Sequence, residues 1–220
     1  MTAKLSGPML LPKSGAQPTM AVVLLHGYGS DGNDLIGLAP YWQDLLPEAL
    51  FVAPNAPEPC QMIESGYQWF DVAFEGDRLA SRQTGVETAR PVLMEFLEAM
   101  WAQTGITPES TLLGGFSQGA MMALHTGLSM ERPLMGVLAF AGAFLPPPEF
   151  GSRVHAKPPV CLIHGEMDDV VEPARSVEAD AALRAGGYDV SYHVSPGTGH
   201  SIAPDGLAFA TEFIRRVAGK

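Results

Sequence analysis

This sequence of 220 residues has few cysteines, few basic residues and no long hydrophobic segment, and each shortage excludes a class of protein. The two cysteines, Cys60 and Cys161, are too few for a scaffold built from disulfides, and Cys161 lies in an apolar segment typical of a buried strand. Lysine and arginine together number 13 against 24 acidic residues, which gives a net charge of -11. Such an acidic chain repels nucleic acids and anionic membrane surfaces, so we expect neither as a partner.

None of the apolar segments is long enough to cross a membrane. The longest spans residues 134–145, contains two glycines and ends at three prolines, whereas a spanning helix needs about 20 residues. Pro8 interrupts the N-terminal residues before they could supply the apolar core of a signal peptide. We therefore expect a cytoplasmic protein without membrane insertion. With 46% hydrophobic residues, the chain can fold as one domain over residues 1–220.

Short apolar segments alternate along the chain with longer segments of helical periodicity. Most of the short segments are continuously apolar, as strands are when helices cover both faces of their sheet. The predicted strands are 21–25, 50–53, 111–113, 136–140, 160–163 and 190–194. The predicted helices are 35–46, 86–101, 118–128, 173–185 and 207–217, with Pro91 in the first turn of the second or at a bend in it. We therefore predict an α/β fold with a mainly parallel sheet, helices on both faces, and residues 1–20 as an edge strand or loop.

The segment 115–119 reads Gly-Phe-Ser-Gln-Gly and lies between a predicted strand and a predicted helix. A serine at the apex of such a turn takes a strained backbone conformation, and small residues two positions before and after it let the strand and helix pack closely. In this geometry the serine hydroxyl is exposed as a nucleophile. Because the same pattern also arises by chance in a glycine-rich chain, Ser117 needs partners elsewhere in the sequence.

The ends of other predicted strands supply these partners, since active sites of open α/β sheets form at the carboxyl ends of strands. Asp168 and Asp169 follow the strand 160–163, and His200 follows the strand 190–194. Serine, acid and histidine thus occur in the chain order of an α/β-hydrolase triad, with His200 as the general base. Adjacent side chains on an extended loop point in different directions, and the spacing does not decide which aspartate faces His200.

The glycine-rich loop after the strand 21–25 suits an oxyanion hole, because its glycines leave backbone N–H groups free. We expect the hole to combine the N–H of Tyr28 with that of Gln118, the residue after the nucleophile. His26 and His164 end strands, and we expect both to bond to nearby backbone. No pair of histidines has the spacing of a helical zinc site and the cysteines stand apart, so we expect no metal.

These motifs resemble those of the phospholipase/carboxylesterase family of α/β-hydrolases, which includes bacterial carboxylesterases and acyl-protein thioesterases. The resemblance spans nearly the whole domain and rests on six ordered segments: Leu25-His26-Gly27-Tyr28-Gly29, Pro54-Asn55-Ala56-Pro57, Trp69-Phe70-Asp71, Gly115-Phe116-Ser117-Gln118-Gly119-Ala120, Gly165-Glu166-Met167-Asp168 and Gly199-His200-Ser201. In the family's acid motif the catalytic residue is the third after the glycine, which selects Asp168 over Asp169. The resemblance implies the α/β-hydrolase fold and a serine hydrolase without a cofactor that cleaves carboxylic esters, or thioesters, through an acyl-enzyme.

Two positions depart from the family's pattern. Tyr28 stands where the thioesterase branch often has leucine, which would reshape the acyl pocket. Asp169 stands where a proline often follows the acid, and its charge near the triad would raise the basicity of His200. Neither change removes a catalytic group.

Four hydrophobic residues are candidates for the pocket that binds the acyl or alcohol group. Trp69, Phe70, Phe144 and Leu145 lie in loops at the same edge of the sheet as the triad. Ordinary packing is the alternative for each of them. The segment that contains Trp69 has a further alternative, in which Asp71 anchors a loop.

We therefore predict a serine carboxylesterase whose partner is a small-molecule ester or thioester with a short to medium acyl group. An acyl-protein thioesterase or lysophospholipase for long acyl groups shares this chemistry and differs in pocket length. Peptide or lactone hydrolysis, and a non-catalytic ligand-binding protein on the same fold, are more distant alternatives. The sequence does not decide the physiological substrate or the oligomeric state, and a homodimer stays open.

Overall fold

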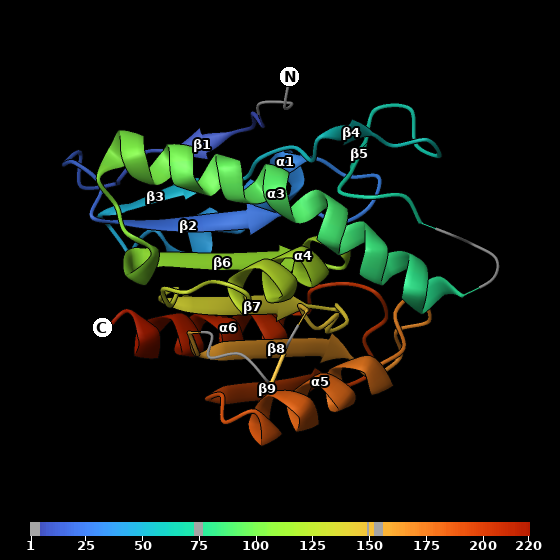
Figure 1. Ribbon diagram of the computed structural model, residues 1–220. Coiled ribbons are helices and arrows are strands. Elements are labelled where there is room, and N and C mark those ends of the chain that lie inside the picture. The colour runs from blue at the N-terminus through green and yellow to red at the C-terminus, as the bar shows by residue number, and fades with distance from the viewer. Residues whose placement is uncertain (1–4, 73–76, 149, 152–155) are drawn as a thin grey trace.

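The computed structural model describes residues 5–72, 77–148, 150–151 and 156–220, which form a sheet with helices on both faces (Figure 1). Within these residues the sheet has seven strands in the order β1-β3-β2-β6-β7-β8-β9, and only β1 runs antiparallel to its neighbour. The strands are β1 (Met9–Leu10), β2 (Met20–Leu25), β3 (Ala49–Val52), β6 (Thr111–Phe116), β7 (Gly136–Phe140), β8 (Val160–Gly165) and β9 (Val190–Ser195). The predicted α/β class with a mainly parallel sheet is confirmed.

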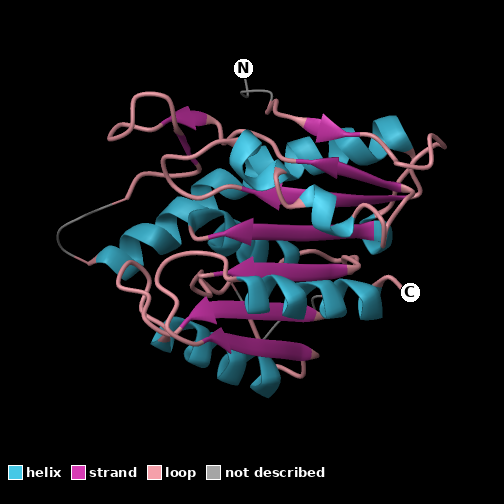
Figure 2. Ribbon diagram, turned by 180° about the vertical axis from the view of Figure 1, so that it is seen from behind, coloured by secondary structure: helices cyan, strands magenta, loops and turns pink. Residues whose placement is uncertain are grey.

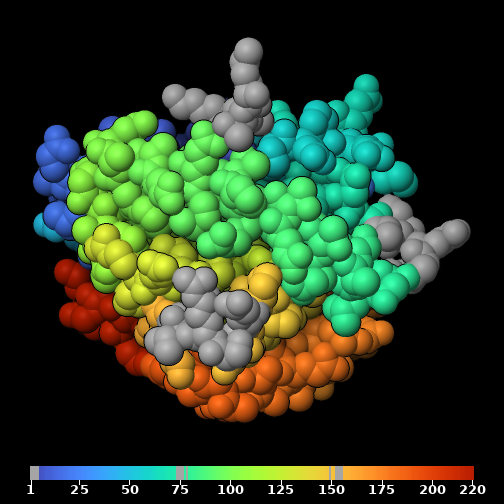
Figure 3. All heavy atoms as spheres, viewed as in Figure 1, coloured from blue at the N-terminus to red at the C-terminus, as the bar shows by residue number. Residues whose placement is uncertain are grey.

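Two groups of helices cover the two faces of the sheet. Those at the front of Figure 1 are α3 (Arg78–Thr104), α4 (Gln118–Gly127) and α5 (Ala174–Ala185). Those on the opposite face, toward the viewer in Figure 2, are α1 (Gly32–Ile36), α2 (Ala39–Trp42) and α6 (Pro204–Val217). In the space-filling view, α3 crosses the upper half of the front face and α5 covers its lower edge (Figure 3). One 3₁₀ turn, η1 (Pro108–Ser110), leads into β6.

Alternate residues of the central strands pack on opposite faces of the sheet. In β2, Ala21, Val23 and Leu25 belong to the core on the side of α3 and α4. Val22 and Leu24 belong to the core on the side of α1, α2 and α6. All five are almost completely buried. A strand that is buried on both faces has no polar face, which explains why the strand segments are continuously apolar.

Two predicted helices differ most from the structure in their bounds. The segment 35–46 forms two short helices instead of one, because Pro40 has no N–H to continue the hydrogen bonds of α1 and instead lies in the first turn of α2. The helix predicted from residue 86 begins at Arg78, where the side chain of Asp77 caps it. Pro91 therefore lies inside α3 and not in its first turn. The first two turns of α3 are mostly polar, so hydrophobic periodicity does not mark them.

The segment before β2 and a short hairpin complete the described structure. β1 pairs with β3 and forms one edge of the sheet. The hairpin consists of β4 (Glu58–Pro59) and β5 (Tyr67–Gln68), and strand periodicity does not predict it because each strand has two residues. None of the helices in the described ranges is both apolar enough and long enough to span a bilayer.

Candidate active site

Ser117 lies at a sharp turn between β6 and α4 with an unusual backbone conformation, φ 53° and ψ -114°. A residue with a side chain rarely adopts a positive φ, so this turn is strained. A Cβ added to Gly115 would lie 2.3 Å from the carbonyl carbon of Gly119, and one added to Gly119 would lie 2.0 Å from the carbonyl oxygen of Leu25. Close packing therefore requires glycine at both positions. This is the steric reason for the small residues two positions before and after Ser117.

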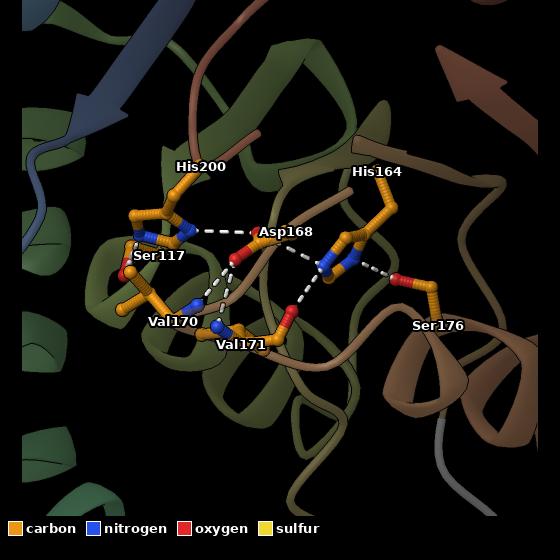
Figure 4. Close-up of polar contacts among 7 residues, drawn as sticks. All are labelled: Ser117, His164, Asp168, Val170, Val171, Ser176 and His200. Atoms are coloured by element: carbon orange, nitrogen blue, oxygen red, sulfur yellow. Dashed lines mark hydrogen bonds and ion pairs between the residues drawn. The ribbon is translucent and has the colours of Figure 1, made fainter. Parts of the chain in front are cut away.

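Ser117, His200 and Asp168 come together at the carboxyl end of the sheet (Figure 4). His200 Nε2 lies 3.0 Å from Ser117 Oγ, and His200 Nδ1 lies 2.7 Å from Asp168 Oδ2. Because a carboxylate only accepts hydrogen bonds, Nδ1 carries the ring proton and Nε2 can accept the proton of the serine. The ring of Phe116 packs against that of His200, with 4.8 Å between the ring centroids, and supports its orientation.

Asp168 is the aspartate that contacts His200, whereas Asp169 is exposed. Asp168 Oδ1 accepts hydrogen bonds from the N–H groups of Val170 (2.9 Å) and Val171 (2.8 Å). Burial opposes the charge of this carboxyl, but the hydrogen bonds from His200 and from the two N–H groups outweigh it and hold the pKa of Asp168 below its ordinary value. Asp168 is therefore charged at neutral pH. In the described part of the chain no hydrogen bond or ion pair joins Asp169 to His200.

Tyr28 and Gln118 carry the two N–H groups that the sequence predicts for an oxyanion hole. Gln118 is the first residue of α4, so its N–H has no acceptor within the helix and lies at the positive end of the helix dipole. Within residues 5–72, 77–148, 150–151 and 156–220, neither N–H donates to a protein acceptor. Both groups therefore remain available to an oxygen of a bound substrate.

The side chain of Gln118 ties the start of α4 to the loop after β5. Its Oε1 accepts a hydrogen bond from the N–H of Trp69 at 2.8 Å, and its Nε2 donates to the carbonyl of Phe70 at 2.7 Å. The residue is only 3% exposed. The sequence predicts a role for its N–H alone. The second role depends on a loop 48 residues earlier in the chain, which no local pattern signals.

The loop that contains Tyr28 is fixed by the preceding residue His26, which is buried and hydrogen-bonded through both ring nitrogens. Nε2 accepts from the N–H of Ala56 at 2.9 Å, so Nδ1 carries the proton and donates to the carbonyl of Gly27 at 2.7 Å. Burial lowers the pKa of His26 below 6.5, which keeps the ring neutral. Bonding to nearby backbone is what the sequence predicts for this histidine.

The β4–β5 hairpin fixes the same loop from the other side. The N–H of Gly29 donates to the carbonyl of Tyr67 at 2.9 Å, and the N–H of Tyr67 donates to the carbonyl of Ser30 at 2.8 Å. Burial and the neighbouring Cys60 raise the pKa of Tyr28 to about 12. The backbone directly after the first departure from the family pattern is thus tied to the hairpin.

The four candidates for the acyl pocket differ in exposure. Trp69, Phe70 and Leu145 are 2%, 5% and 1% exposed, and Trp69 Nε1 donates to the carbonyl of His26 at 3.0 Å. Phe144 is partly buried and packs against the same core. The three buried side chains mainly fill the core, and only Phe144 of the four candidates is partly exposed.

Asp71 anchors its loop, as the alternative for this segment predicts. Its Oδ1 accepts hydrogen bonds from Gln68 Nε2 at 2.5 Å and from Gln61 Nε2 at 3.1 Å. The carboxylate therefore joins β5 to the connection between β4 and β5.

A large apolar cavity lies away from the triad. It has a volume of about 740 Å³ and lies between α3 and the N-terminal edge of the sheet, where Val92, Phe96 and Met100 face Leu5 and Val52. No member of the triad lines it. The cavity is therefore separate from the group formed by Ser117, His200 and Asp168.

The described residues contain no group of three or more histidine, cysteine and acidic side chains that could share a metal ion. The two cysteines are buried and free. The polar groups gathered at the carboxyl end of the sheet are instead those of nucleophilic catalysis, namely a hydroxyl, an imidazole and a carboxylate in series.

Comparison with known proteins agrees with this geometry. Residues 11–218 match the family model of phospholipase/carboxylesterase. The sequence is 30% identical to acyl-protein thioesterase 1 of Gibberella zeae, over 95% of this chain and 94% of that protein, and 31% identical to esterase YpfH of Escherichia coli, over 92% and 85%. The crystal structure of esterase PE8 superposes with a TM-score of 0.93 at 52% identity and covers 97% of this chain and 99% of that one. The chain therefore belongs to the phospholipase/carboxylesterase family of α/β-hydrolases.

Proposed function

We propose that the protein is a serine carboxylesterase that hydrolyses small esters with short to medium acyl groups. The observation that carries the proposal is the position of His200, whose ring nitrogens lie 3.0 Å from Ser117 Oγ and 2.7 Å from Asp168 Oδ2. A serine hydroxyl is a weak nucleophile until a base takes its proton, and a base with this orientation supplies that step.

In the first half of the reaction, Ser117 Oγ attacks the carbonyl carbon of the ester while His200 Nε2 takes the serine proton. The carbonyl oxygen becomes an oxyanion, and the N–H groups of Tyr28 and Gln118 stabilise it, with about 3 kcal/mol expected from each donor. The intermediate then breaks its bond to the alcohol oxygen, and His200 gives that oxygen the proton. The alcohol leaves, and the acyl group remains bound to Ser117.

In the second half, water replaces the alcohol. His200 takes a proton from the water as the water oxygen attacks the acyl carbon, and the second oxyanion is stabilised by the same N–H groups. The bond to Ser117 Oγ breaks, and the serine recovers its proton from His200. Asp168 stays ionised throughout and stabilises the charged imidazolium, which is consistent with its lowered pKa.

The burial of the pocket candidates favours a small acyl group. Trp69, Phe70 and Leu145 are almost completely buried, so they offer little surface along which a long chain could lie. The large apolar cavity is lined by α3 and the N-terminal segment and by no residue of the triad. A short acyl group needs neither a long hydrophobic surface beside Ser117 nor this cavity.

A thioesterase acting on longer acyl groups is the second candidate, and the similarity to proteins named acyl-protein thioesterase 1 favours it. A thioester carbonyl reacts with Ser117 in the same way, and the leaving group is then a thiol. The two candidates differ in pocket length and in access to the site, not in the catalytic groups.

Hydrolysis of p-nitrophenyl esters from acetyl to palmitoyl, with a palmitoyl thioester in parallel, tests the proposal. Wild type and Ser117→Ala are compared on each substrate. We expect turnover that peaks at short chains and disappears in Ser117→Ala. A peak on long chains or on the thioester would favour the thioesterase. If no substrate shows serine-dependent turnover, the carboxylesterase and the thioesterase are both overturned. Hydrolysis of another type of bond, or ligand binding without catalysis, would then remain.

A further inference from the structure

A second histidine contacts the acid of the triad. His164 lies in β8, and its Nε2 is 3.1 Å from Asp168 Oδ2. This is the same oxygen that His200 Nδ1 contacts at 2.7 Å, so two imidazole rings share one carboxylate oxygen (Figure 4). The side chains of His164 and Asp168 are both completely buried.

The partners of His164 fix its tautomer. Nε2 also lies 2.8 Å from the carbonyl oxygen of Val171, and both this oxygen and that of Asp168 are acceptors. Nε2 must therefore carry the proton. Nδ1 contacts the hydroxyl of Ser176 in α5, which can donate to it. The ring of His164 thus lies between the hydroxyl of Ser176 and the carbonyl of Val171, to which its Nε2 donates.

Few other charges influence this network. The loop after β8 and the first turns of α5 carry charged side chains, which are exposed or engaged in ion pairs with one another: Glu166, Asp169, Glu172, Arg175 and Glu178. Among the described residues, His200 is the side chain whose hydrogen bond lowers the pKa of Asp168. The interior of the network therefore consists of one carboxylate and two imidazoles.

We propose that His164 is a positioning residue for the triad, which holds Asp168 in place and withdraws part of its negative charge from His200. Two backbone N–H groups donate to Oδ1, and the N–H of His164, which donates to the carbonyl of Val171, lies 3.1 Å from Oδ2, so that one direction remains for His200 Nδ1. This inference rests on the proposed function, because it concerns the efficiency of the same base.

Loss of the His164 N–H would change His200 in a definite direction. Without the positive end of this N–H 3.1 Å from it, Oδ2 would present more of its charge to His200 and favour the protonated ring. The pKa that governs the acidic limb of kcat/KM would then rise. At the same time Asp168 would be held less firmly, so kcat would fall. A role that is only structural would lower stability without moving the acidic limb.

The test compares His164→Leu, His164→Gln and Ser176→Ala with wild type. The control is His125→Leu, which removes another buried histidine that bonds to a backbone carbonyl outside this network. For His164→Leu we expect kcat on p-nitrophenyl acetate to fall about 10-fold, KM to stay within about twofold, and the acidic limb to move up by about 0.5 pH unit. Gln offers an amide N–H close to the lost Nε2. In His164→Gln we therefore expect most of the kcat to be recovered and the acidic limb to lie close to its wild-type position. Ser176→Ala should move the limb in the same direction by less.

An acidic limb that stays at the wild-type pH in His164→Leu and in Ser176→Ala overturns the inference, as does a shift of equal size in His125→Leu. If His164→Leu does not fold, Ser176→Ala alone decides, because it removes only one hydroxyl. These outcomes are separate from the proposed function, which Ser117→Ala tests: its full retention of activity would overturn the function, whatever His164 does.

Discussion

The N–H of Ala56 donates a hydrogen bond to His26 Nε2 over 2.9 Å, so a buried neutral ring joins the loop after β3 to the loop after β2. The other nitrogen of the ring donates to the carbonyl of Gly27. The ring therefore fixes the backbone directly before Tyr28, the proposed oxyanion donor. A residue that the sequence assigns to local bonding thus controls the position of an N–H group in the site.

Replacing His26 by leucine removes both hydrogen bonds and leaves the buried N–H of Ala56 unpaired, whereas the carbonyl of Gly27 keeps the hydrogen bond that it accepts from the N–H of Ser30 at 3.3 Å. We expect the free energy of unfolding to fall by about 1–3 kcal/mol because of this unpaired N–H. We also expect kcat to fall with little change in KM, because the N–H of Tyr28 would no longer be held toward the developing oxyanion. Urea unfolding and steady-state kinetics on p-nitrophenyl acetate measure the two effects.

The control for this variant is His193→Leu. His193 is partly exposed and bonds to Asp205 at 2.8 Å, so its loss should change stability by no more than about 1 kcal/mol and leave kcat unchanged. A normal kcat in His26→Leu, together with reduced stability, would show that the ring supports the fold without placing the oxyanion donor.

Asp168 and Asp169 provide a matched pair for testing the acid. Asp168→Asn keeps the shape of the side chain but lets the amide hold His200 in the wrong tautomer, so we expect kcat to fall about 10⁴-fold. Asp169 is exposed and has no hydrogen bond or ion pair with His200 in the described ranges, so Asp169→Asn should keep kcat within about twofold. Steady-state kinetics of both variants decide the assignment, and the reverse order of losses would show that Asp169 is the acid.

The sequence predicts the central sheet well, and it places the three proposed catalytic residues after strands, for physical reasons that particular residues show. Strands such as β7 are buried on both faces, and a continuous apolar segment records this directly. Ser117 and Asp168 each follow such a strand and His200 follows the edge strand β9, so their meeting at one edge is a consequence of parallel topology. The choice between Asp168 and Asp169 depends on a side-chain direction, which spacing does not contain.

The features that the sequence does not predict depend on contacts between distant segments. The β4–β5 hairpin has too few residues for a periodic pattern, yet it holds the loop that contains Tyr28. The contact of His164 with Asp168 requires the ring of a residue near the end of β8 to point toward the loop that follows this strand. The bond of Gln118 to Trp69 joins residues 49 positions apart. Local periodicity carries no information on such pairs.

Gly115 and Gly114 are neighbours in β6 and offer a sharp test of the strained turn. A Cβ on Gly115 would lie 2.3 Å from the backbone of Gly119, which cannot move without displacing α4. A Cβ on Gly114 would meet side-chain atoms of Leu24 at 3.3 Å and Leu138 at 3.5 Å, which is close to ordinary contact. We therefore expect Gly115→Ala to lose more than about 3 kcal/mol of stability together with its activity, and Gly114→Ala to lose less than about 1.5 kcal/mol and stay active.

Thermal or urea unfolding and ester hydrolysis check the two glycine variants. Equal stabilities would show that the turn relaxes to admit a side chain at Gly115. Loss of activity in Gly114→Ala at normal stability would show that the strand and not the turn sets the position of Ser117.

Two buried histidines predict how stability depends on pH. Burial lowers the pKa of His26 and of His125 below 6.5 in the folded protein. In the unfolded chain both rings bind a proton as the pH falls through about 6.5, whereas the folded protein binds it only at lower pH. Stability is therefore fully present above about pH 7 and falls between the unfolded and the folded pKa values. The slope is at most about 1.4 kcal/mol per pH unit for each ring.

Urea unfolding from about pH 8 to pH 5 measures this slope in wild type, His125→Leu and Asp168→Asn. His125→Leu removes one of the two rings, so its stability should fall less steeply below about pH 6.5 even if it is lower throughout. The carboxyl of Asp168 has its pKa lowered from 3.8, so it contributes stability that is lost only as the pH falls below about 4, and Asp168→Asn should follow the wild-type slope in this range. Equal slopes in wild type and His125→Leu would mean that the buried ring already binds its proton in the folded protein. The hydrogen bond from His125 to the carbonyl of Leu145 would then be made by a charged ring inside the core.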